Sequence, residues 1–288
     1  MTNLGCRTLE LPFAVRVLYP TEAPARAERF GAYELELAHD APVAAHRMLL
    51  VAFSHGTGGT PFAYRGLAKA LVAANHAVAL ITHPGNNRDD DSLANTVQNL
   101  EDRPRHVTQA LDAAFADPHL APHLVPERAA VFGHSMGGYT ALAVSGARPM
   151  ALPQQTADGK AAPVAVTPDR RVVGAILFAP ALPWLMAPGA LDDVHARVMV
   201  RACEKDEAAP PFFIERIVRG LPPRAELDYA VVPGAGHFAC FWPLHPLLAT
   251  LPPGQDPPGF DRAAYQPALH ADVLGFLSRV TAPLPPDA

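Results

Sequence analysis

The sequence predicts an α/β fold in which helices flank a mostly parallel sheet. The chain contains short, continuously apolar runs, such as residues 48–53, which are typical of strands buried on both faces of a parallel sheet. These runs alternate with longer segments of helical periodicity, such as residues 61–74. Because strands and helices follow one another in this way, we expect a parallel sheet with helical connections.

Strands of another kind are expected near the N-terminus. Apolar and other residues alternate over residues 11–19 and again over 33–37, which predicts two strands, the second with one solvated face. The helix over 61–74 is opened by Thr60 and a proline. Residues 83–103 are polar and are expected to form a loop. The remaining expected strands cover residues 78–81, 129–132, 172–178, 198–202 and 227–232, and the remaining expected helices cover 104–115, 139–144, 212–218 and 263–280.

No internal repeat or linker divides the sequence, so residues 1–288 are expected to form one α/β domain. Two proline-rich segments, residues 149–169 and 243–258, interrupt the alternation of strands and helices. Each could be a lid that roofs a pocket at the carboxyl ends of the strands. A plain surface loop is the alternative for both.

Composition excludes several classes of function. With 49% hydrophobic residues the chain can bury a large core, and its net charge of −5 argues against nucleic-acid binding. No apolar run approaches the roughly 18 residues of a membrane span. The three widely spaced cysteines indicate free thiols in a reducing compartment. Because the N-terminus also lacks a signal-peptide pattern, we expect a cytoplasmic location.

Gly133-His134-Ser135-Met136-Gly137 is the most informative stretch of the sequence. An apolar run precedes it and a second apolar segment follows it, which predicts a strand, a sharp turn and a helix. A nucleophile elbow has this order, because its strained turn holds a serine hydroxyl out at the top of the sheet. The residues flanking the serine must be small, and the two glycines meet that need. The alternative is an ordinary strand-to-helix turn with a capping serine.

A serine hydroxyl is a weak nucleophile and needs a base within hydrogen-bond reach. Nucleophile elbows are followed along the chain by an acid and then by a histidine. Asp206 is the preferred acid, because it lies just past the apolar strand at 198–202. The competing carboxylates belong to Glu204, Glu207, Asp192 and Asp193, and the alternative for all of them is a solvated charged loop.

His237 is the preferred base among 13 histidines. It follows the strand expected at 227–232 and lies in a glycine-rich turn. An imidazole suits the role because its charge changes near neutral pH. His134, next to the serine, is expected to pack in the elbow rather than act as the base.

Acyl transfer also needs hydrogen-bond donors directed at the developing oxyanion. We expect these to be the backbone amides of Met136 and of Thr57, which lies in a glycine-rich loop after the strand at 48–53. This loop lacks the pattern of a phosphate-binding loop. The candidates for contact with a substrate are Gly56, Phe62 and Phe238. Tyr64, Phe241 and Trp242 are further candidates to line an apolar pocket. Ordinary core and loop packing is the alternative for all five aromatic residues.

No metal or other cofactor is expected. His119 and His123 are four residues apart, but Pro118 and Pro122 break any helix that would place them on one face. The acidic run at 89–91 lacks the spaced ligands and the glycine of a calcium loop.

Taken together, these segments resemble the α/β-hydrolase superfamily, and more narrowly the bacterial dienelactone-hydrolase-like and platelet-activating-factor-acetylhydrolase-like serine hydrolases. The matching segments are Phe53-Ser54-His55-Gly56-Thr57-Gly58-Gly59, His83-Pro84-Gly85-Asn86, Gly133-His134-Ser135-Met136-Gly137-Gly138-Tyr139-Thr140-Ala141, Glu204-Lys205-Asp206 and Pro233-Gly234-Ala235-Gly236-His237-Phe238. Authentic dienelactone hydrolases resemble this pattern but use a cysteine where this chain has Ser135, which favours an esterase. Thr82 replaces the family's usual acid, so no role tied to that position is carried over.

The sequence and this resemblance predict a metal-independent serine hydrolase that cleaves carboxylic esters of a small or short-chain acyl substrate through an acyl-enzyme. An amidase or a lactonase on the same fold is an alternative. A non-catalytic binding protein of the same fold is the alternative from another class, and it is disfavoured because serine, acid and histidine all occur in the required order.

Overall fold

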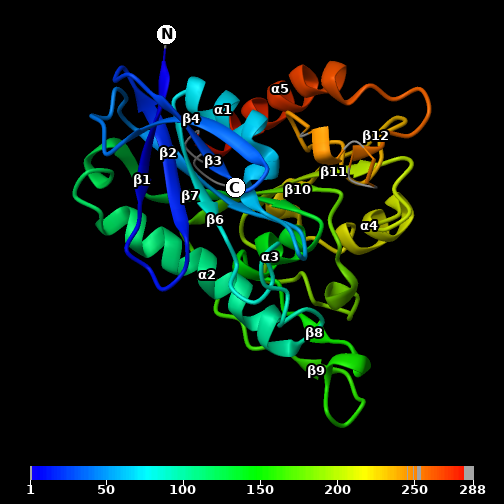
Figure 1. Cartoon of the computed structure of the whole chain (residues 1–288). Helices are drawn as coiled ribbons and strands as arrows, with labels where there is room; N and C mark the ends of the chain where they lie inside the picture. The colour runs from blue at the N-terminus through cyan, green and yellow to red at the C-terminus, as the bar shows by residue number, and fades with distance from the viewer. Residues whose placement is uncertain (1, 245, 249, 252–253, 282–288) are drawn as a thin grey trace.

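The structure is a computed structural model that describes residues 2–244, 246–248, 250–251 and 254–281. Within these residues one large sheet has the strand order β12-β11-β10-β7-β5-β6-β2-β1-β4-β3 (Figure 1). Its strands are β1 (Asn3–Thr8), β2 (Val15–Thr21), β3 (Arg26–Phe30), β4 (Tyr33–His39), β5 (Met48–Ser54), β6 (His76–Ile81), β7 (Leu124–His134), β10 (Val172–Phe178), β11 (Arg197–Cys203) and β12 (Asp228–Val232).

The helices are α1 (Arg65–Ala73), α2 (Val97–Ala116), α3 (Met136–Val144), α4 (Pro211–Val218) and α5 (Arg262–Thr281). Short 3₁₀ helices are η1 (Pro61–Tyr64), η2 (Ala121–His123), η3 (Pro153–Gln155), η4 (Pro183–Leu185), η5 (Pro223–Ala225) and η6 (Pro246–Leu248). A small separate hairpin pairs β8 (Met150–Ala151) with β9 (Ala162–Pro163).

The sheet is parallel where the candidate site lies. From β12 to β6 every neighbouring pair is parallel, and β2 then pairs antiparallel with β6. This confirms the mostly parallel sheet expected from the continuously apolar runs. The carboxyl ends of β5, β7 and β11 therefore meet at one edge, and the residues that follow these strands are brought together there.

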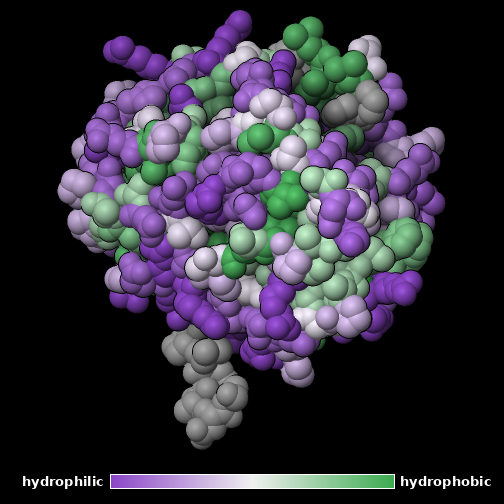
Figure 2. Space-filling model, turned by 90° about the horizontal axis from the view of Figure 1, so that it is seen from below, coloured by the Kyte–Doolittle hydropathy of each residue, from purple (hydrophilic) through white to green (hydrophobic). Residues whose placement is uncertain are grey.

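Helices cover both faces of the sheet. In Figure 1, α1 and α5 lie above it and α2 and α3 lie below it. Side chains of α1 and α5 share one hydrophobic cluster with one face of the strands, while α2, α3 and α4 share the other. The two clusters explain why β5 is buried along its whole length. Seen from below in Figure 2, the surface is mainly hydrophilic, with hydrophobic residues in separate groups.

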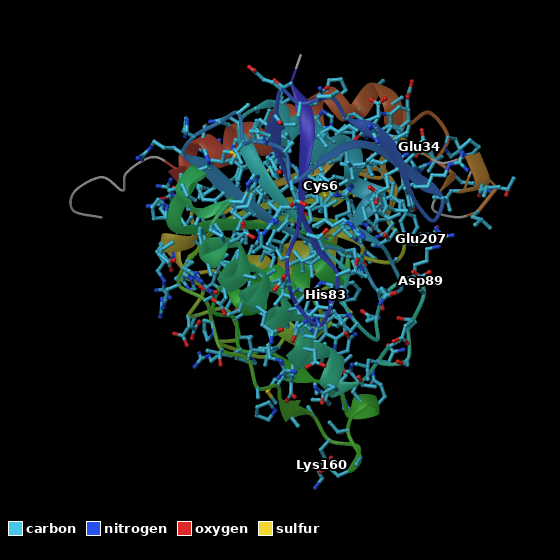
Figure 3. All side chains as sticks on the ribbon, turned by 60° about the vertical axis from the view of Figure 1, so that its left-hand side comes forward. Cys6, Glu34, His83, Asp89, Lys160 and Glu207 are labelled. Carbon is cyan, nitrogen blue, oxygen red and sulfur yellow. The ribbon has the colours of Figure 1, made fainter. Side chains whose placement is uncertain are left out.

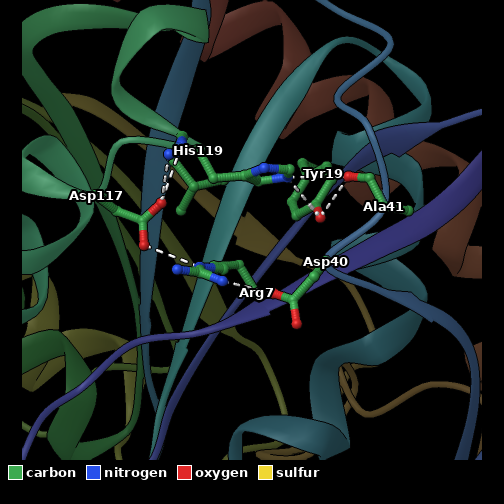
Figure 4. Close-up of polar contacts among 7 residues, drawn as sticks. Arg7, Tyr19, Asp40, Ala41, Asp117 and His119 are labelled. Atoms are coloured by element: carbon green, nitrogen blue, oxygen red, sulfur yellow. Dashed lines mark hydrogen bonds and ion pairs between the residues drawn. The ribbon is translucent and has the colours of Figure 1, made fainter.

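The N-terminal strands extend the sheet beyond its parallel part. The strand expected from residue 11 begins only at Val15, because Leu9 donates its amide to the Val15 carbonyl and the chain bends between them. The sequence reading missed β1 and β3, which carry few apolar residues. Figure 4 shows how β1 is held: Arg7 pairs with Asp40 and with Asp117, the residue after α2.

Helix α2 begins seven residues before the start predicted at Pro104. Thr96 caps it, with its side chain accepting a hydrogen bond from the Asn99 amide. Proline inside a helix leaves the carbonyl four residues earlier without its usual donor. Here the Tyr139 hydroxyl supplies that donor, lying 2.8 Å from the Leu100 carbonyl oxygen. A side chain of α3 thus compensates the proline, which a reading of local signals could not foresee.

The two proline-rich segments lie in different places. Residues 149–169 contain the β8–β9 hairpin and pack along α3, with Gln155 accepting a hydrogen bond from the Trp184 indole. Figure 3 shows Lys160 at the tip of this hairpin, far below Glu207, which follows the preferred acid. Part of 243–258 lies beside the histidine turn, where a Cβ on Gly236 would be 3.1 Å from Pro257. Residues 245, 249, 252 and 253 of that segment are outside the described residues.

Among the helices described, none is long and apolar enough to cross a membrane.

Candidate active site

Ser135 lies in a strained turn between β7 and α3. Its backbone has φ 53° and ψ −120°, a combination that a residue with a side chain rarely adopts. A Cβ on Gly133 would be 2.0 Å from the Gly137 carbonyl oxygen, and one on Gly137 would be 1.9 Å from that of Ser54. Because both obstacles are backbone atoms, only glycine fits on either side of the serine. The structure therefore has the strand, the strained turn and the helix that the sequence predicts here.

The loop after β5 lies directly against this turn. A Cβ on Gly56 would be 3.2 Å from the Cβ of Ser135, so the two backbones approach closely. Ser135 is held by its neighbours on the other side: its amide donates to the Phe178 carbonyl, and its carbonyl accepts from Ala181. The serine is half-buried between the ends of three adjacent parallel strands.

Asp206 and His237 form a hydrogen-bonded pair at the same edge. Asp206 Oδ2 lies 2.7 Å from His237 Nδ1, and its side chain is fully buried while that of His237 is 12% exposed. The other oxygen, Oδ1, accepts hydrogen bonds from the amides of Ala208 and Ala209. Because a carboxylate only accepts, Nδ1 of His237 carries the proton and Nε2 is left free to accept one.

A chain of hydrogen bonds links His237 to the elbow through His134. The Gly56 amide donates to the Tyr64 hydroxyl, which lies 3.0 Å from His134 Nδ1. His134 Nε2 lies 2.9 Å from the carbonyl oxygen of His237. Burial holds the pKa of His134 well below its ordinary value. His134 is therefore neutral, accepts from Tyr64, and donates to the backbone of His237.

The two expected oxyanion donors remain available. The amide of Gly56 is already bound to Tyr64, whereas the amides of Thr57 and Met136 have no partner elsewhere in the described chain. Met136 begins α3, so its amide points out of the first turn of a helix, where negative charge is favoured.

Three more histidines, His55, His83 and His106, are buried near the start of the loop after β5. Figure 3 shows His83 in the interior. Burial, with a contribution from the Arg103 guanidinium, lowers the pKa of His55 to about 3 and that of His106 to about 4. The same causes hold the pKa of His83 well below its ordinary value. His83 contacts Ser54 Oγ at 2.9 Å and His106 at 3.2 Å. All three rings are neutral at pH 7.

The aromatic candidates for substrate contact are divided between two places. Phe238 and Phe241 surround the ring of His134, with centroids 5.9 and 5.2 Å away. Phe62 instead stacks on Phe30 at 4.2 Å and lines a cavity of about 310 Å³ beside the β3–β4 hairpin. Tyr64, expected among pocket-lining residues, is fully buried, and its hydroxyl is used within the hydrogen-bond chain described above.

Sequence reasoning missed Arg103 and gave no role to Asn86, although Asn86 belongs to one of the segments that resemble the family. Both residues lie behind the loop that carries Thr57. Both fall in the stretch 83–103 that was expected to be a loop, where a polar residue has no obvious partner. A buried arginine has no local sequence signal, because its hydrogen-bond partners here come from β5 and α3 as well as from the loop after β6.

Within the part of the chain that the structure describes, no group of three or more His, Cys, Asp or Glu side chains could hold a metal ion.

Solved structures with a similar fold include two that are named as hydrolases. The chain is similar to a predicted CIB-like hydrolase from Thermoplasma acidophilum, with 14% identity, a TM-score of 0.54 and coverage of 97% of this chain and 100% of that one. It is also similar to a dienelactone hydrolase from Anabaena variabilis, with 16% identity, a TM-score of 0.56 and coverage of 96% and 98%. No protein-family model matches the chain, and no curated protein matches it in sequence.

Similarity at this level of identity shows a shared fold. The chain therefore has the α/β-hydrolase fold, as the resemblance of its motifs implied.

Proposed function

We propose that the protein is a serine hydrolase that cleaves carboxylic esters with a small or short-chain acyl group. The observation that carries this proposal is the strained backbone of Ser135 at the edge of the sheet where Asp206 and His237 are paired at 2.7 Å. A residue held in this backbone conformation is destabilising by about 1–3 kcal/mol. Such strain is found where a side chain must be presented for chemistry, which supports a catalytic role for the serine.

In the proposed first step, Ser135 Oγ attacks the ester carbonyl carbon while His237 Nε2 accepts the hydroxyl proton. Asp206 keeps the proton on Nδ1 and stabilises the imidazolium that forms. The carbonyl oxygen becomes an oxyanion, which accepts hydrogen bonds from the amides of Thr57 and Met136. The tetrahedral intermediate then collapses, the bond to the alcohol oxygen breaks, and His237 returns its proton to the leaving alcohol.

The second step repeats this chemistry with water. His237 removes a proton from a water molecule as its oxygen attacks the acyl-serine carbonyl. Collapse of the second intermediate releases the carboxylic acid and returns the proton to Ser135 Oγ. No redox step and no further reactant are required.

The test is a chain-length series of nitrophenyl esters, beginning with acetate and butyrate. The wild-type protein is expected to hydrolyse the short esters, and Ser135→Ala is expected to lower kcat by about 10⁶ without changing the fold. Matched amide and lactone substrates establish which acyl bond is cleaved most efficiently. A Ser135→Ala protein with near wild-type esterase activity would remove the basis of the proposal.

A further inference from the structure

Arg103, in the middle of α2, is fully buried. Its guanidinium donates hydrogen bonds to four neutral oxygen atoms. Nε lies 3.1 Å from Thr140 Oγ1, Nη1 lies 2.6 Å from Asn86 Oδ1, and Nη2 lies 3.3 Å from Ser54 Oγ. Nη2 also donates to the backbone carbonyl oxygen of His55. These contacts join α2 to β5, to α3 and to the loop after β6.

The charge on this guanidinium has no direct counter-ion among the described residues. The nearest carboxylate in the network belongs to Asp91, which is reached only through Asn86, whose Nδ2 lies 2.6 Å from Asp91 Oδ1. Burial lowers the pKa of Arg103 to about 9, so the group remains charged at pH 7. Burying a charge without a paired carboxylate is unfavourable. A neutral side chain of similar volume would avoid this penalty, so stability alone does not account for an arginine here.

Three of the four contacts lead to the segments that carry the two proposed oxyanion donors. His55, whose carbonyl accepts from Arg103, is the first residue of the loop that carries Thr57. Asn86 Nδ2 lies 2.8 Å from Thr57 Oγ1. On the other side, Thr140 Oγ1 lies 3.2 Å from the carbonyl oxygen of Met136. Arg103 thus reaches Thr57 through Asn86 and reaches Met136 through Thr140. Among the described residues, no other side chain is hydrogen-bonded to both Asn86 and Thr140.

We propose that Arg103 is a positioning residue for the oxyanion hole, which fixes the Thr57 loop against the first turn of α3 and places a buried positive charge behind both donors. Donors that are already oriented need no rearrangement as charge develops, and a fixed cation in a water-poor interior stabilises that charge further. The inference rests on the proposed function, since it assigns a role in the same reaction. It adds a residue that touches no reacting atom.

If Arg103 served stability alone, its replacement would have a different effect. Its loss would lower the stability of the fold, while each molecule that still folded would react at the wild-type rate. A positioning residue changes kcat in the folded population and leaves KM almost unchanged, because the ground-state carbonyl needs the donors less than the oxyanion does.

The experiment compares three variants with the wild type at pH 7.5. Thr140→Val removes one acceptor with little change of shape, and Arg103→Lys keeps the charge but loses the planar fork. Arg105→Gln is the matched control, since Arg105 lies on the same helix with an exposed side chain paired to Asp102. We expect kcat for a nitrophenyl ester to fall about 10-fold in Thr140→Val and about 100-fold in Arg103→Lys. Neither decrease should exceed the decrease in kcat that follows removal of a direct oxyanion donor. KM should change by less than about 3-fold, and Arg105→Gln should match the wild type.

Two further readouts separate positioning from stability. Affinity for a boronic acid, which forms a tetrahedral adduct with a serine, should weaken by the same factor as kcat falls. Amide hydrogen exchange should become faster at Gly59 and Gly138, whose amides bind the carbonyls of Gly56 and Ser135. Unchanged kcat and unchanged boronate affinity in folded Thr140→Val and Arg103→Lys would overturn the inference. If the wild type hydrolyses no ester, the proposed function fails, and the exchange data still decide whether Arg103 orders the two donor segments.

Discussion

Replacing Asp206 with asparagine should leave the fold intact and remove almost all activity. The two oxygens of Asp206 have different partners. Oδ1 accepts from the amides of Ala208 and Ala209 at 2.9 and 2.8 Å, and Oδ2 lies 2.7 Å from His237 Nδ1. The two amides are fixed donors, so the asparagine oxygen must take the Oδ1 position. Its NH₂ group is then forced to face His237.

That orientation reverses the roles of the two imidazole nitrogens. Facing an NH₂ donor, His237 Nδ1 must accept, so the proton moves to Nε2. An Nε2 that carries a proton cannot accept one from Ser135. A tautomer error of this kind lowers kcat by about 10⁴, which corresponds to about 5.4 kcal/mol of transition-state stabilisation.

The assay is steady-state hydrolysis of nitrophenyl butyrate by Asp206→Asn and by Glu204→Gln. Glu204 lies in the same loop but is exposed and accepts from the Gly234 amide, so its variant serves as the control. Circular dichroism and a thermal melt establish that both are folded. If Asp206→Asn is nearly as active as the wild type, while Glu204→Gln or Asp193→Asn is inactive, the acid has been assigned to the wrong carboxylate.

Three further predictions concern the base, metals and acid stability. His237→Ala should lose nearly all activity. His134→Ala should keep the acidic limb in the pH profile of kcat/KM, because burial keeps His134 neutral. An active His237→Ala enzyme with an unchanged profile would show that another residue is the base. Activity should survive prolonged dialysis against EDTA, because the proposed chemistry uses only protein groups; loss with recovery on adding zinc would refute this. The folded pKa of His106, about 4, is below the unfolded value of about 6.5, so its contribution to stability is complete above pH 6.5 and is lost as pH falls toward 4. In urea titrations, the unfolding free energy of the wild type should fall between pH 6.5 and 4.5 by about 2 kcal/mol more than that of His106→Gln. An equal fall in the two proteins would show that His106 is not buried as a neutral ring.

The parts of the site that could be predicted are those with local signals. The elbow is a short motif whose glycines are required by backbone contacts within it and by Ser54. Asp206 follows the buried strand β11, and His237 follows β12, the mostly half-buried strand at the edge of the sheet. Both strands are predictable from the sequence, and a parallel sheet brings their carboxyl ends to one edge. The sequence therefore placed an acid and a histidine at that edge, and the structure pairs these two side chains.

The supporting residues could not be predicted, because their partners are distant in sequence. Arg103 contacts Ser54, 49 residues away, and Thr140, 37 residues away. Local signals predict a start of α2 at Pro104, seven residues too late, because proline is a strong helix-start signal and the hydroxyl that compensates it belongs to Tyr139 of another helix. For Tyr64 the sequence leaves pocket lining and core packing open, and the structure buries the ring, with its hydroxyl hydrogen-bonded to the Gly56 amide and to His134. In each case tertiary contacts override the local preference.

The most direct measurement of the central claim is the site of covalent labelling by a fluorophosphonate. The reagent reacts with a serine hydroxyl only when that hydroxyl is activated, and tandem mass spectrometry identifies the modified residue. We predict a single adduct on Ser135, no adduct in Ser135→Ala, and slow labelling in His237→Ala. An intact protein that hydrolyses esters while Ser135 stays unlabelled, or an adduct at another serine, would contradict the account.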